Sequence, residues 1–400
     1  MKQIITLIFL QFFSLIGCHS SVPVNVDPQL KEKKVLSGAE NMHAYLPLLK
    51  NKRVACVVHH ASRVGDNHLI DTLLALGIQV VKIMAPEHGF RGTSDAGEKV
   101  QNDTDSKTGI PIVSLYGKSK KPTAAMLEDI DIVLFDLQDV GARFYTYIST
   151  LHYVMEACGE LGKKLIVLDR PNPHVHYLDG PMLEDGYQSF IGMHHVPTVY
   201  GMTIGEYGKM INGEMWTSYK QQIDLMVVPC VNFKRSVRYD IPLPPSPNLP
   251  NPTAVLLYPT LCFFEGTDYS VGRGTSKQFQ VIGHPGMKGD YSFTPAPNLG
   301  AKDPFQNGKK CFGYDYSGSS LESLFAMKKI DLQLIVNVYK ETVAANQNFF
   351  LDNLFFDKLA GTDKFRKMLI DGKSAEEIRS SWQPALNEFP RIRAKYLIYE

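Results

Sequence analysis

Acidic, basic and amide side chains follow three apolar runs of the chain, at the points where each run gives way to turn residues. They are Glu87, His88 and Arg91 after residues 80–84, Asp136, Gln138 and Asp139 after residues 131–135, and Asp169, Arg170 and Asn172 after residues 164–168. Such runs predict buried strands, and the carboxyl ends of parallel strands meet at the sheet edge where ligands bind. We therefore expect these side chains to converge on one crevice.

Glu87 has the residue type and the setting of a general acid, because a carboxyl beside a histidine in a cleft can have a raised pKa. The alternative is a carboxylate that caps its turn or pairs with Arg91. Asp136 and Asp139 lie close to Arg143 in the sequence, and we expect at least one of them to form a salt bridge.

Further polar candidates lie beyond residue 240. They are Glu265, Asp268 and Arg273 in the glycine-containing segment 262–275, and Ser246 and Asn248 in the proline-dense segment 242–252. The latter segment either lines the site or is a spacer. With aromatic side chains such as Tyr145, this mixture suits a carbohydrate with an acidic substituent, because aromatic rings stack on sugar rings and arginine binds a carboxylate through two hydrogen bonds. Paired carboxyl groups would carry out glycosidic cleavage.

Composition and motifs argue against several other classes of function. Lysine and arginine together number 42 against 41 for aspartate and glutamate, and no basic run with interleaved aromatics occurs, so nucleic acid is not an expected partner. No GxGxxG follows the first predicted strand and no GxSxG occurs, which argues against a dinucleotide cofactor and a serine nucleophile. The adjacent pairs His59-His60 and His194-His195 lack the spacing of metal ligands, and we predict no metal and no other cofactor.

The elements that must position these side chains follow from the hydrophobic periodicity. Short apolar runs alternate with amphipathic segments, which predicts an α/β fold with a parallel, doubly wound sheet. The predicted strands are 54–58, 80–84, 112–115, 132–135, 165–168 and 225–228, and the predicted helices are 69–76, 124–129, 146–161 and 203–211. Gly77 and Gly162 lie where a left-handed C-cap is expected.

A chain of 400 residues is longer than one hydrophobic core usually serves, so two domains are expected. We predict a first domain over 35–241 and a second over 253–400. The proline-dense segment 242–252 connects them, because prolines cannot lie inside a strand or a helix. Short strands followed by helices, including 332–345 and 375–382, predict an α+β second domain.

The first residues have the features of an exported lipoprotein. Lys2 precedes an apolar run that is too short to span a membrane but typical of a signal peptide. The run ends in Leu15-Ile16-Gly17-Cys18, which resembles a bacterial lipobox; the alternative is a plain secretory signal. We predict a signal peptide over 1–17, a lipid on Cys18, a tether over 18–34 and a place in the cell envelope, periplasmic or membrane-anchored, with the lipid as the only membrane attachment.

Five cysteines remain after Cys18, an odd number for an exported protein. Cys56, Cys158, Cys230 and Cys262 lie in apolar runs without CxxC spacing. We expect buried free thiols rather than disulfides or a metal site.

Seven blocks of the sequence resemble, in order, the signature blocks of the NamZ exo-β-N-acetylmuramidases, a family formerly described as a domain of unknown function. They lie between about residues 50 and 285 and are Pro86–Gly89, Asp95–Glu98, Ser114–Gly117, Phe135–Tyr147, Leu168–Pro173, Pro245–Asn248, and Phe264–Thr267 with Gly272–Thr275. The segments His59–Ser62 and His194–His195 depart from the family pattern, but neither contains the acids.

The resemblance implies a glycoside hydrolase that removes terminal, non-reducing N-acetylmuramic acid from peptidoglycan fragments. It also implies a Rossmann-like N-terminal domain, a smaller C-terminal domain and an active-site cleft between them, with Glu87 as the favoured catalytic acid. We expect Glu265 or Asp136 to supply the second carboxyl, as base or nucleophile according to the separation of the pair.

The lactyl carboxylate of muramic acid needs a cationic partner, and we expect at least one of Arg143, Arg170 and Arg273 to bind it. Two other classes of function stay open. One is a non-catalytic envelope lipoprotein that binds peptidoglycan. The other is a metal-dependent hydrolase that uses His88 with Asp136.

Overall fold

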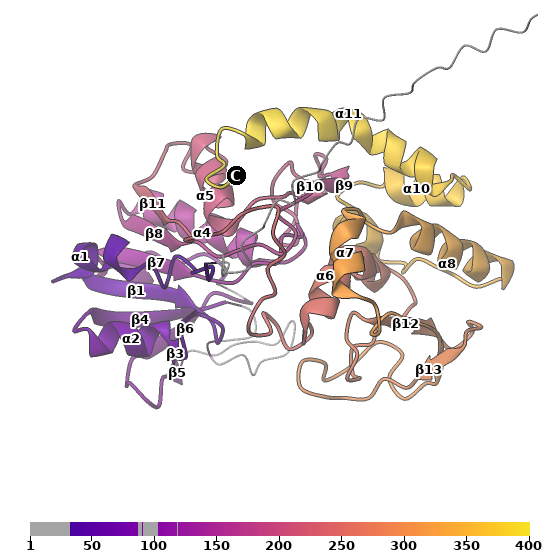
Figure 1. Cartoon of the computed structure of the whole chain (residues 1–400), viewed down its shortest axis with the longest axis horizontal. Coiled ribbons are helices and arrows are strands. Elements are labelled where there is room, and N and C mark those ends of the chain that lie inside the picture. The colour runs from indigo at the N-terminus through magenta and orange to yellow at the C-terminus, as the bar shows by residue number, and fades with distance from the viewer. Residues whose placement is uncertain (1–32, 87–89, 91–102, 118) are drawn as a thin grey trace, which may run out of the picture. The chain divides into compact units, whose positions relative to one another are not determined.

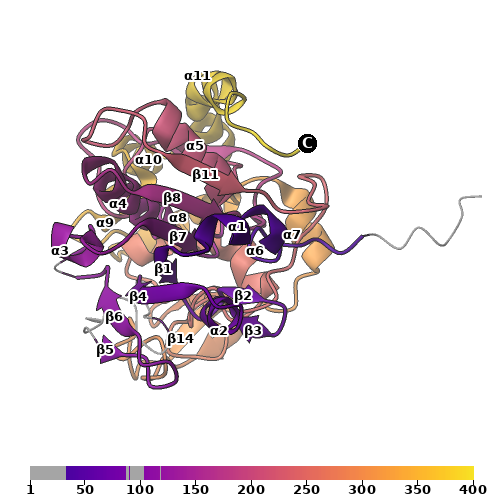
Figure 2. The same ribbon diagram turned by 90° about the vertical axis from the view of Figure 1, so that its left-hand side faces the viewer.

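The computed structural model of the chain describes residues 33–86, 90, 103–117 and 119–400. Val35–Glu400 form one compact unit, built on a seven-stranded sheet in the order β11-β8-β7-β1-β4-β6-β5, which Figure 2 shows strand by strand. Six of these strands are parallel and β5 is antiparallel to β6. Their bounds are β1 Arg53–Val58, β4 Gln79–Ala85, β5 Asp103–Thr104, β6 Pro111–Ser114, β7 Ile132–Asp136, β8 Lys164–Leu168 and β11 Leu225–Val228.

The six predicted strands all exist, because their apolar runs fill both faces of the sheet. In β1, Val54, Cys56 and Val58 belong to the core on one face, whereas Ala55 and Val57 belong to the core on the other. Helices cover both faces, α1 and α2 on the first and α4 and α5 on the second. The helices of this half are η1 Met42–Ala44, α1 Leu46–Leu49, α2 Leu69–Ala75, α3 Ala124–Leu127, α4 Tyr147–Glu160 and α5 Ile204–Gly213.

The order of the strands makes the sheet doubly wound. The chain passes from β1 to β4 and β6, then returns to β7 on the other side of β1 and continues to β8 and β11. The carboxyl ends of β1 and β7 therefore flank the point where the winding reverses. Two short antiparallel pairs complete this half, β2 Arg63–Val64 with β3 Asn67–His68, and β9 Asp179–Met182 with β10 Pro197–Val199.

Local signals place the helix ends. Gly77 and Gly162, just beyond α2 and α4, have φ angles of 74° and 61°, as predicted for left-handed caps. At the start of α5, the Thr203 hydroxyl accepts from the Glu206 backbone and the Glu206 carboxylate accepts from the Thr203 backbone, which satisfies two amide groups that the helix leaves unpaired.

The proline-dense segment leads directly into a helix that the sequence analysis does not predict. Helix α6 (Pro252–Leu261) begins with Pro252 at its first turn, is capped by the Asn251 side chain, and continues into the 3-10 helix η2 (Cys262–Gly266). Residues 254–261 are buried or half-buried all round. Without a polar face, the segment lacks the periodicity that identifies a helix.

The C-terminal half is smaller and mixes strands with helices, as predicted. Its antiparallel sheet has the order β12-β14-β13, and helix α11 runs across one side of the molecule in Figure 1. The elements are β12 Val281–His284, β13 Tyr291–Phe293, β14 Cys311–Asp315, α7 Leu321–Met327, α8 Leu332–Ala344, α9 Phe355–Ala360, α10 Lys364–Ile370 and α11 Ala375–Arg393.

Helix α11 extends eleven residues past the predicted end at Trp382 and contains Pro384 and Pro390. Its buried side chains, which include Ile378, Trp382 and Leu386, recur every fourth residue and hold one face of the helix on the core. This packing carries the helix through prolines that would end an isolated helix.

One hydrophobic core joins the two halves. It includes Val133 and Phe135 of the central sheet, Tyr258 of α6, and Phe356 and Trp382 of the C-terminal helices. Both sides of segment 242–252 thus share a core, and the division into domains over 35–241 and 253–400 stays a prediction. Within the described residues, no helix combines the length and apolar character that crossing a bilayer requires.

Candidate active site

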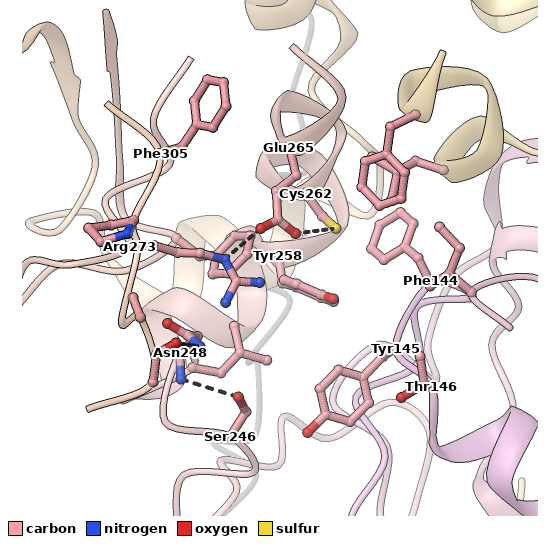
Figure 3. A pocket seen from close by; sticks show the side chains of 18 of the residues that line it. Phe144, Tyr145, Thr146, Ser246, Asn248, Tyr258, Cys262, Glu265, Arg273 and Phe305 are labelled. Carbon is pink, nitrogen blue, oxygen red and sulfur yellow. Dashed lines mark hydrogen bonds and ion pairs between the residues drawn. The ribbon is translucent and has the colours of Figure 1, made fainter. Parts of the chain in front are cut away.

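A pocket of about 390 Å³ lies where the loop before α4, the proline-dense segment, α6 with η2, and two loops of the C-terminal half come together, and Figure 3 shows most of its side chains. Its volume is within the range of about 300–1,000 Å³ that is usual for small-molecule sites. The lining residues are Phe144–Tyr147, Ile191, Ser246, Asn248, Leu249, Tyr258, Cys262, Glu265, Arg273, Phe279, Gly300, Ala301, Asp303, Pro304, Phe305, Phe355 and Leu359. Both sides of the predicted connection contribute to it.

Helix α6 and its extension η2 position three of these side chains. Tyr258, Cys262 and Glu265 are four and three residues apart, so they lie on one face of the continuous helix. Glu265 accepts a hydrogen bond from the Arg273 guanidinium, with 2.5 Å between Oε1 and Nε, and the Cys262 thiol donates to its Oε2 over 3.5 Å. The helix therefore presents to the pocket a carboxyl group that is hydrogen-bonded to an arginine.

Arg273 lies on a turn between two glycines that both adopt left-handed backbone angles. Gly272 has φ 80° and Gly274 has φ 79°, and a Cβ on either would lie 2.6 Å from a backbone oxygen. The guanidinium packs on the Phe279 ring, 5.0 Å from its centroid. Its Nε is bonded to Glu265, and in Figure 3 the two terminal nitrogens are visible beside the pocket. They supply a fork that suits a planar anion.

Aromatic rings form the pocket wall that faces this pair. Tyr258 packs edge to face with Phe144, Tyr145 and Phe279, with ring centroids 5.3, 6.0 and 4.9 Å apart. The Tyr145 hydroxyl donates to the Pro245 carbonyl over 2.9 Å, so this wall is tied to the proline-dense segment. The arrangement offers ring surfaces beside a carboxylate and a guanidinium.

The two polar residues of the proline-dense segment also line the pocket. Ser246 accepts a hydrogen bond from the Asn248 backbone over 3.2 Å, and the Asn248 amide donates to the Gly300 carbonyl over 2.7 Å. Gly300 has φ 93°, and a Cβ there would lie 2.7 Å from Pro247. The segment is thus in contact with the far loop of the pocket.

The acids at the end of β7 and just beyond it are not among the side chains that line this pocket. Asp136 is fully buried, and both its carboxylate oxygens accept from Arg170, at 2.5 Å from Nε and 2.8 Å from Nη2. A salt bridge is formed as expected, but with Arg170 rather than with Arg143. This ion pair connects the ends of β7 and β8, and neither side chain lines the pocket.

Asp139 and Gln138 hold the same loop. One Asp139 oxygen accepts from the Gly141 backbone over 2.8 Å and from the Tyr200 hydroxyl. Burial raises the pKa of Asp139 to about 6, against the lowering effect of these hydrogen bonds. The Gln138 amide donates to the Pro171 carbonyl over 2.9 Å, and its backbone N–H donates to His59 Nε2 over 2.9 Å.

Arg143 is buried and forms hydrogen bonds to several elements of the fold. Its guanidinium donates to the backbone carbonyls of Pro181, Val196, Leu359 and Ala360 over 2.6 to 3.1 Å. Burial lowers its pKa to about 10. It is not among the side chains that line the pocket.

Asp169 and Asn172 also make internal contacts. Asp169 is buried and accepts from the hydroxyls of Thr203 and Tyr399 over 2.7 and 2.6 Å. Burial raises its pKa to about 7. The Asn172 amide donates to the Met202 carbonyl over 2.6 Å.

Asp268 is not among the side chains that line the pocket, and it contacts His284 and Gln306. His284 Nε2 lies 3.1 Å from its Oδ2, and the Gln306 amide donates to its Oδ1 over 2.8 Å. Glu87, His88 and Arg91 lie outside the described residues, as does Cys18.

Most of the lining residues were not predicted as site residues, and Tyr258, Phe279, Asp303 and Phe305 are the clearest examples. Tyr258 lies in the unpredicted helix α6, and Phe279 lies in a segment that was predicted to form short strands and turns. Asp303 and Phe305 lie in the loop between β13 and β14. An aromatic residue within the polar stretch Asp303–Gly308 was the available signal for Phe305.

Apart from Cys262, the cysteines named in the sequence analysis do not line the pocket, and neither do the pairs His59-His60 and His194-His195. His194 is buried and lies 2.9 Å from His152, Nε2 to Nδ1. Over the described ranges, no three His, Cys, Asp or Glu side chains are grouped as metal ligands would be. The five cysteines in the described chain are buried and unpaired, which confirms the predicted free thiols.

A second cavity of about 320 Å³ lies against other residues of α6, and leucines such as Leu257, Leu261 and Leu324 line it together with serine, histidine and other polar side chains. It contains no arginine. The carboxylate, the guanidinium and the aromatic wall of the first pocket make that pocket the better candidate for a polar, ring-shaped ligand.

Comparisons with family models and with a curated protein both relate this chain to the NamZ family. The family model described as exo-beta-N-acetylmuramidase NamZ, N-terminal, matches residues 54–253, and the corresponding C-terminal model matches residues 256–399. The peptidoglycan beta-N-acetylmuramidase NamZ of Bacillus subtilis (strain 168) is 36% identical over 421 aligned residues, which cover 98% of this chain and 97% of that protein.

Two solved structures of DUF1343 family proteins from Bacteroides fragilis NCTC 9343 are also similar. The first superposes with a TM-score of 0.84 at 45% sequence identity, and the second with 0.76 at 28%. Each covers 92% of this chain, and this chain covers 99% of each. The similarity therefore extends across both halves of the fold.

Proposed function

Because the chain belongs to the NamZ family of exo-β-N-acetylmuramidases, we propose that it is a glycosidase that releases terminal, non-reducing N-acetylmuramic acid from peptidoglycan fragments. The relationship covers almost the whole chain. The observation that supports this pocket as the active site is the Glu265–Arg273 pair beside an aromatic wall. Cleavage of an acidic sugar requires a carboxyl group, a cation for the acidic substituent and surfaces for the ring.

Arg273 is the arginine that we propose for the lactyl carboxylate. Of the three predicted candidates, it is the one that lines the pocket, whereas Arg143 and Arg170 use their donors on internal acceptors. Its Nε is bonded to Glu265, which orients the guanidinium, and the terminal nitrogens can then form two parallel hydrogen bonds with a carboxylate.

Glu87 stays our proposal for the general acid, and Glu265 becomes our proposal for the second carboxyl. Glu265 lines the pocket, with a side chain that is 21% exposed, whereas Asp136 is fully buried and paired at both oxygens. Glu265 is also held in position by its hydrogen bond from Arg273, as a base or nucleophile that faces the substrate must be.

The test is release of sugar from two disaccharides of opposite order. We expect the purified chain to release N-acetylmuramic acid from a disaccharide that carries it at the non-reducing end, and to leave the disaccharide with N-acetylglucosamine at that end uncleaved. Chromatography with mass detection measures both. Binding without release would indicate the non-catalytic alternative, and loss of activity in EDTA that is restored by a divalent metal would indicate the metal-dependent hydrolase.

Steady-state kinetics on aryl glycosides test Arg273. Arg273→Lys keeps the charge but loses the fork, so the ratio of kcat/KM for aryl muramic acid glycosides to that for aryl N-acetylglucosamine glycosides should fall about tenfold. Arg238→Lys is the matched control, because Arg238 forms an ion pair with Glu322 outside the pocket. An unchanged ratio in Arg273→Lys would place carboxylate recognition elsewhere.

A further inference from the structure

Phe305 is a large apolar side chain that stays 44% exposed although it lines the pocket. The other rings of the pocket are less exposed: Tyr258 is 7% and Phe279 1% exposed, and Phe355 is half-buried. Figure 3 shows the Phe305 ring at the edge of the pocket, apart from the Glu265–Arg273 pair. The pocket therefore has a closed end with the charged pair and an open mouth with an aromatic ring.

The turn that carries Phe305 is held in place by its neighbours. The Asn307 backbone donates to the Pro304 carbonyl over 3.1 Å. Gln306 adopts a left-handed φ of 60°, and its amide donates to the backbone carbonyl and to Oδ1 of Asp268 over 2.9 and 2.8 Å. Hydrogen bonds of the neighbouring residues therefore hold the turn that places the Phe305 ring at the mouth of the pocket.

We infer that Phe305 is the stacking platform of a second sugar subsite, which binds the N-acetylglucosamine residue next to the scissile bond. This inference rests on the proposed function. An enzyme that removes the terminal sugar holds that sugar at the closed end, so the next sugar of the strand must lie in the mouth. The C–H groups on one face of a pyranose ring pack against an aromatic ring and remove apolar surface from water.

Asp303, two residues before Phe305, is also exposed and lines the mouth. Its carboxylate accepts hydrogen bonds from sugar hydroxyls and disfavours a second anionic sugar at that position. A neutral N-acetylglucosamine therefore fits the mouth better than another muramic acid. The closed end has the opposite preference, because Arg273 offers donors to an acid.

The test separates the two subsites. Covering about 50 Å² of the Phe305 ring corresponds to about a tenfold change in affinity. Phe305→Ala should raise KM for the disaccharide of N-acetylmuramic acid on N-acetylglucosamine about tenfold with kcat little changed, since the lost binding is uniform. The inhibition constant of free N-acetylmuramic acid, which occupies the closed end, should not change, and Phe305→Trp should restore KM.

Leu299→Ala is the matched control, because Leu299 is a 65% exposed apolar residue of the same loop that does not line the pocket. Unchanged KM in Phe305→Ala, or an equal loss for the disaccharide and the free sugar, would overturn the inference. If the wild-type chain releases no sugar, the proposed function fails. Calorimetric titration of the same two sugars into wild type and Phe305→Ala then makes the same comparison: weaker binding of the disaccharide alone supports the subsite, and equal binding overturns it.

Discussion

Three arginines that each lie in a predicted loop, Arg143, Arg170 and Arg273, have different surroundings in the folded chain. Arg143 is bonded to four backbone carbonyls, Arg170 to a buried carboxylate, and Arg273 to a carboxylate at the pocket. Because the residue type is the same, the hydrogen-bond acceptors that surround each guanidinium decide the role of that arginine. A functional arginine is recognised here by the donors that it retains towards a cavity.

At the same scale, we predict that Glu87 donates the proton to the leaving sugar oxygen. Glu87→Gln keeps the shape of the side chain but cannot supply the proton, so kcat should fall roughly 100-fold or more on disaccharides and much less on aryl glycosides with good leaving groups. Steady-state kinetics on both substrates measure this difference. Glu376→Gln, an exposed position of α11, is the control; an equal, small loss on both substrates would assign Glu87 to turn capping.

At the scale of elements, the pocket depends on contacts between segments that are distant in the sequence. Arg143, next to the pocket-lining Phe144, donates to carbonyls of β9, of the segment before β10 and of the end of α9. One of these carbonyls belongs to Leu359, which itself lines the pocket. The buried guanidinium therefore positions a wall of the site without touching a ligand.

We predict that Arg143→Met lowers the free energy of unfolding by at least about 3 kcal/mol, because it leaves buried carbonyls without donors at about 1–3 kcal/mol each. Chemical denaturation measures the change. Arg238→Met, which removes an ion pair near the surface, should change the free energy of unfolding by less than about 1 kcal/mol. Equal effects of the two substitutions would show that the buried hydrogen bonds of Arg143 add little.

At the scale of the whole molecule, the end of the chain returns to the central sheet. The Tyr399 hydroxyl donates to Asp169, which follows β8, and the Ile398 backbone donates to Glu206 of α5 over 2.7 Å. The C-terminus accordingly lies beside α5 in Figure 1. The last residues, which follow α11 of the smaller half, thus stabilise the larger one, consistent with one compact unit over Val35–Glu400.

The lipid anchor belongs to this scale as well, and it stays a proposal, since Cys18 lies outside the described residues. The apolar run that ends in Leu15-Ile16-Gly17-Cys18 supports it. In a bacterial host, Cys18→Ala should abolish fatty-acid labelling and move the protein from the membrane fraction to the soluble fraction. Cys158→Ala, at a buried thiol, is the control, and labelling of Cys18→Ala at the wild-type level would contradict the proposal.

The sequence by itself determined the parallel strands of the sheet, but not the short antiparallel strand β5. All six parallel strands, helices α2, α4 and α5, and the caps at Gly77 and Gly162 were predictable, because continuous apolar runs and the 3.6-residue period of buried side chains are local properties of the chain. Helix α6 was not predictable, since a helix that is buried all round has no such period. The ordered blocks of the sequence also predicted the family.

Only the tertiary structure decided which polar residues meet at the pocket. The acids Asp136 and Asp169 at strand ends looked equivalent to Glu265, yet both are used in buried hydrogen bonds, while Glu265 lies on an unpredicted helix. Phe305 and Tyr145 reach the same pocket from positions 160 residues apart. Whether a buried carboxylate is already paired depends on distances between remote segments, and no local pattern in the sequence contains those distances.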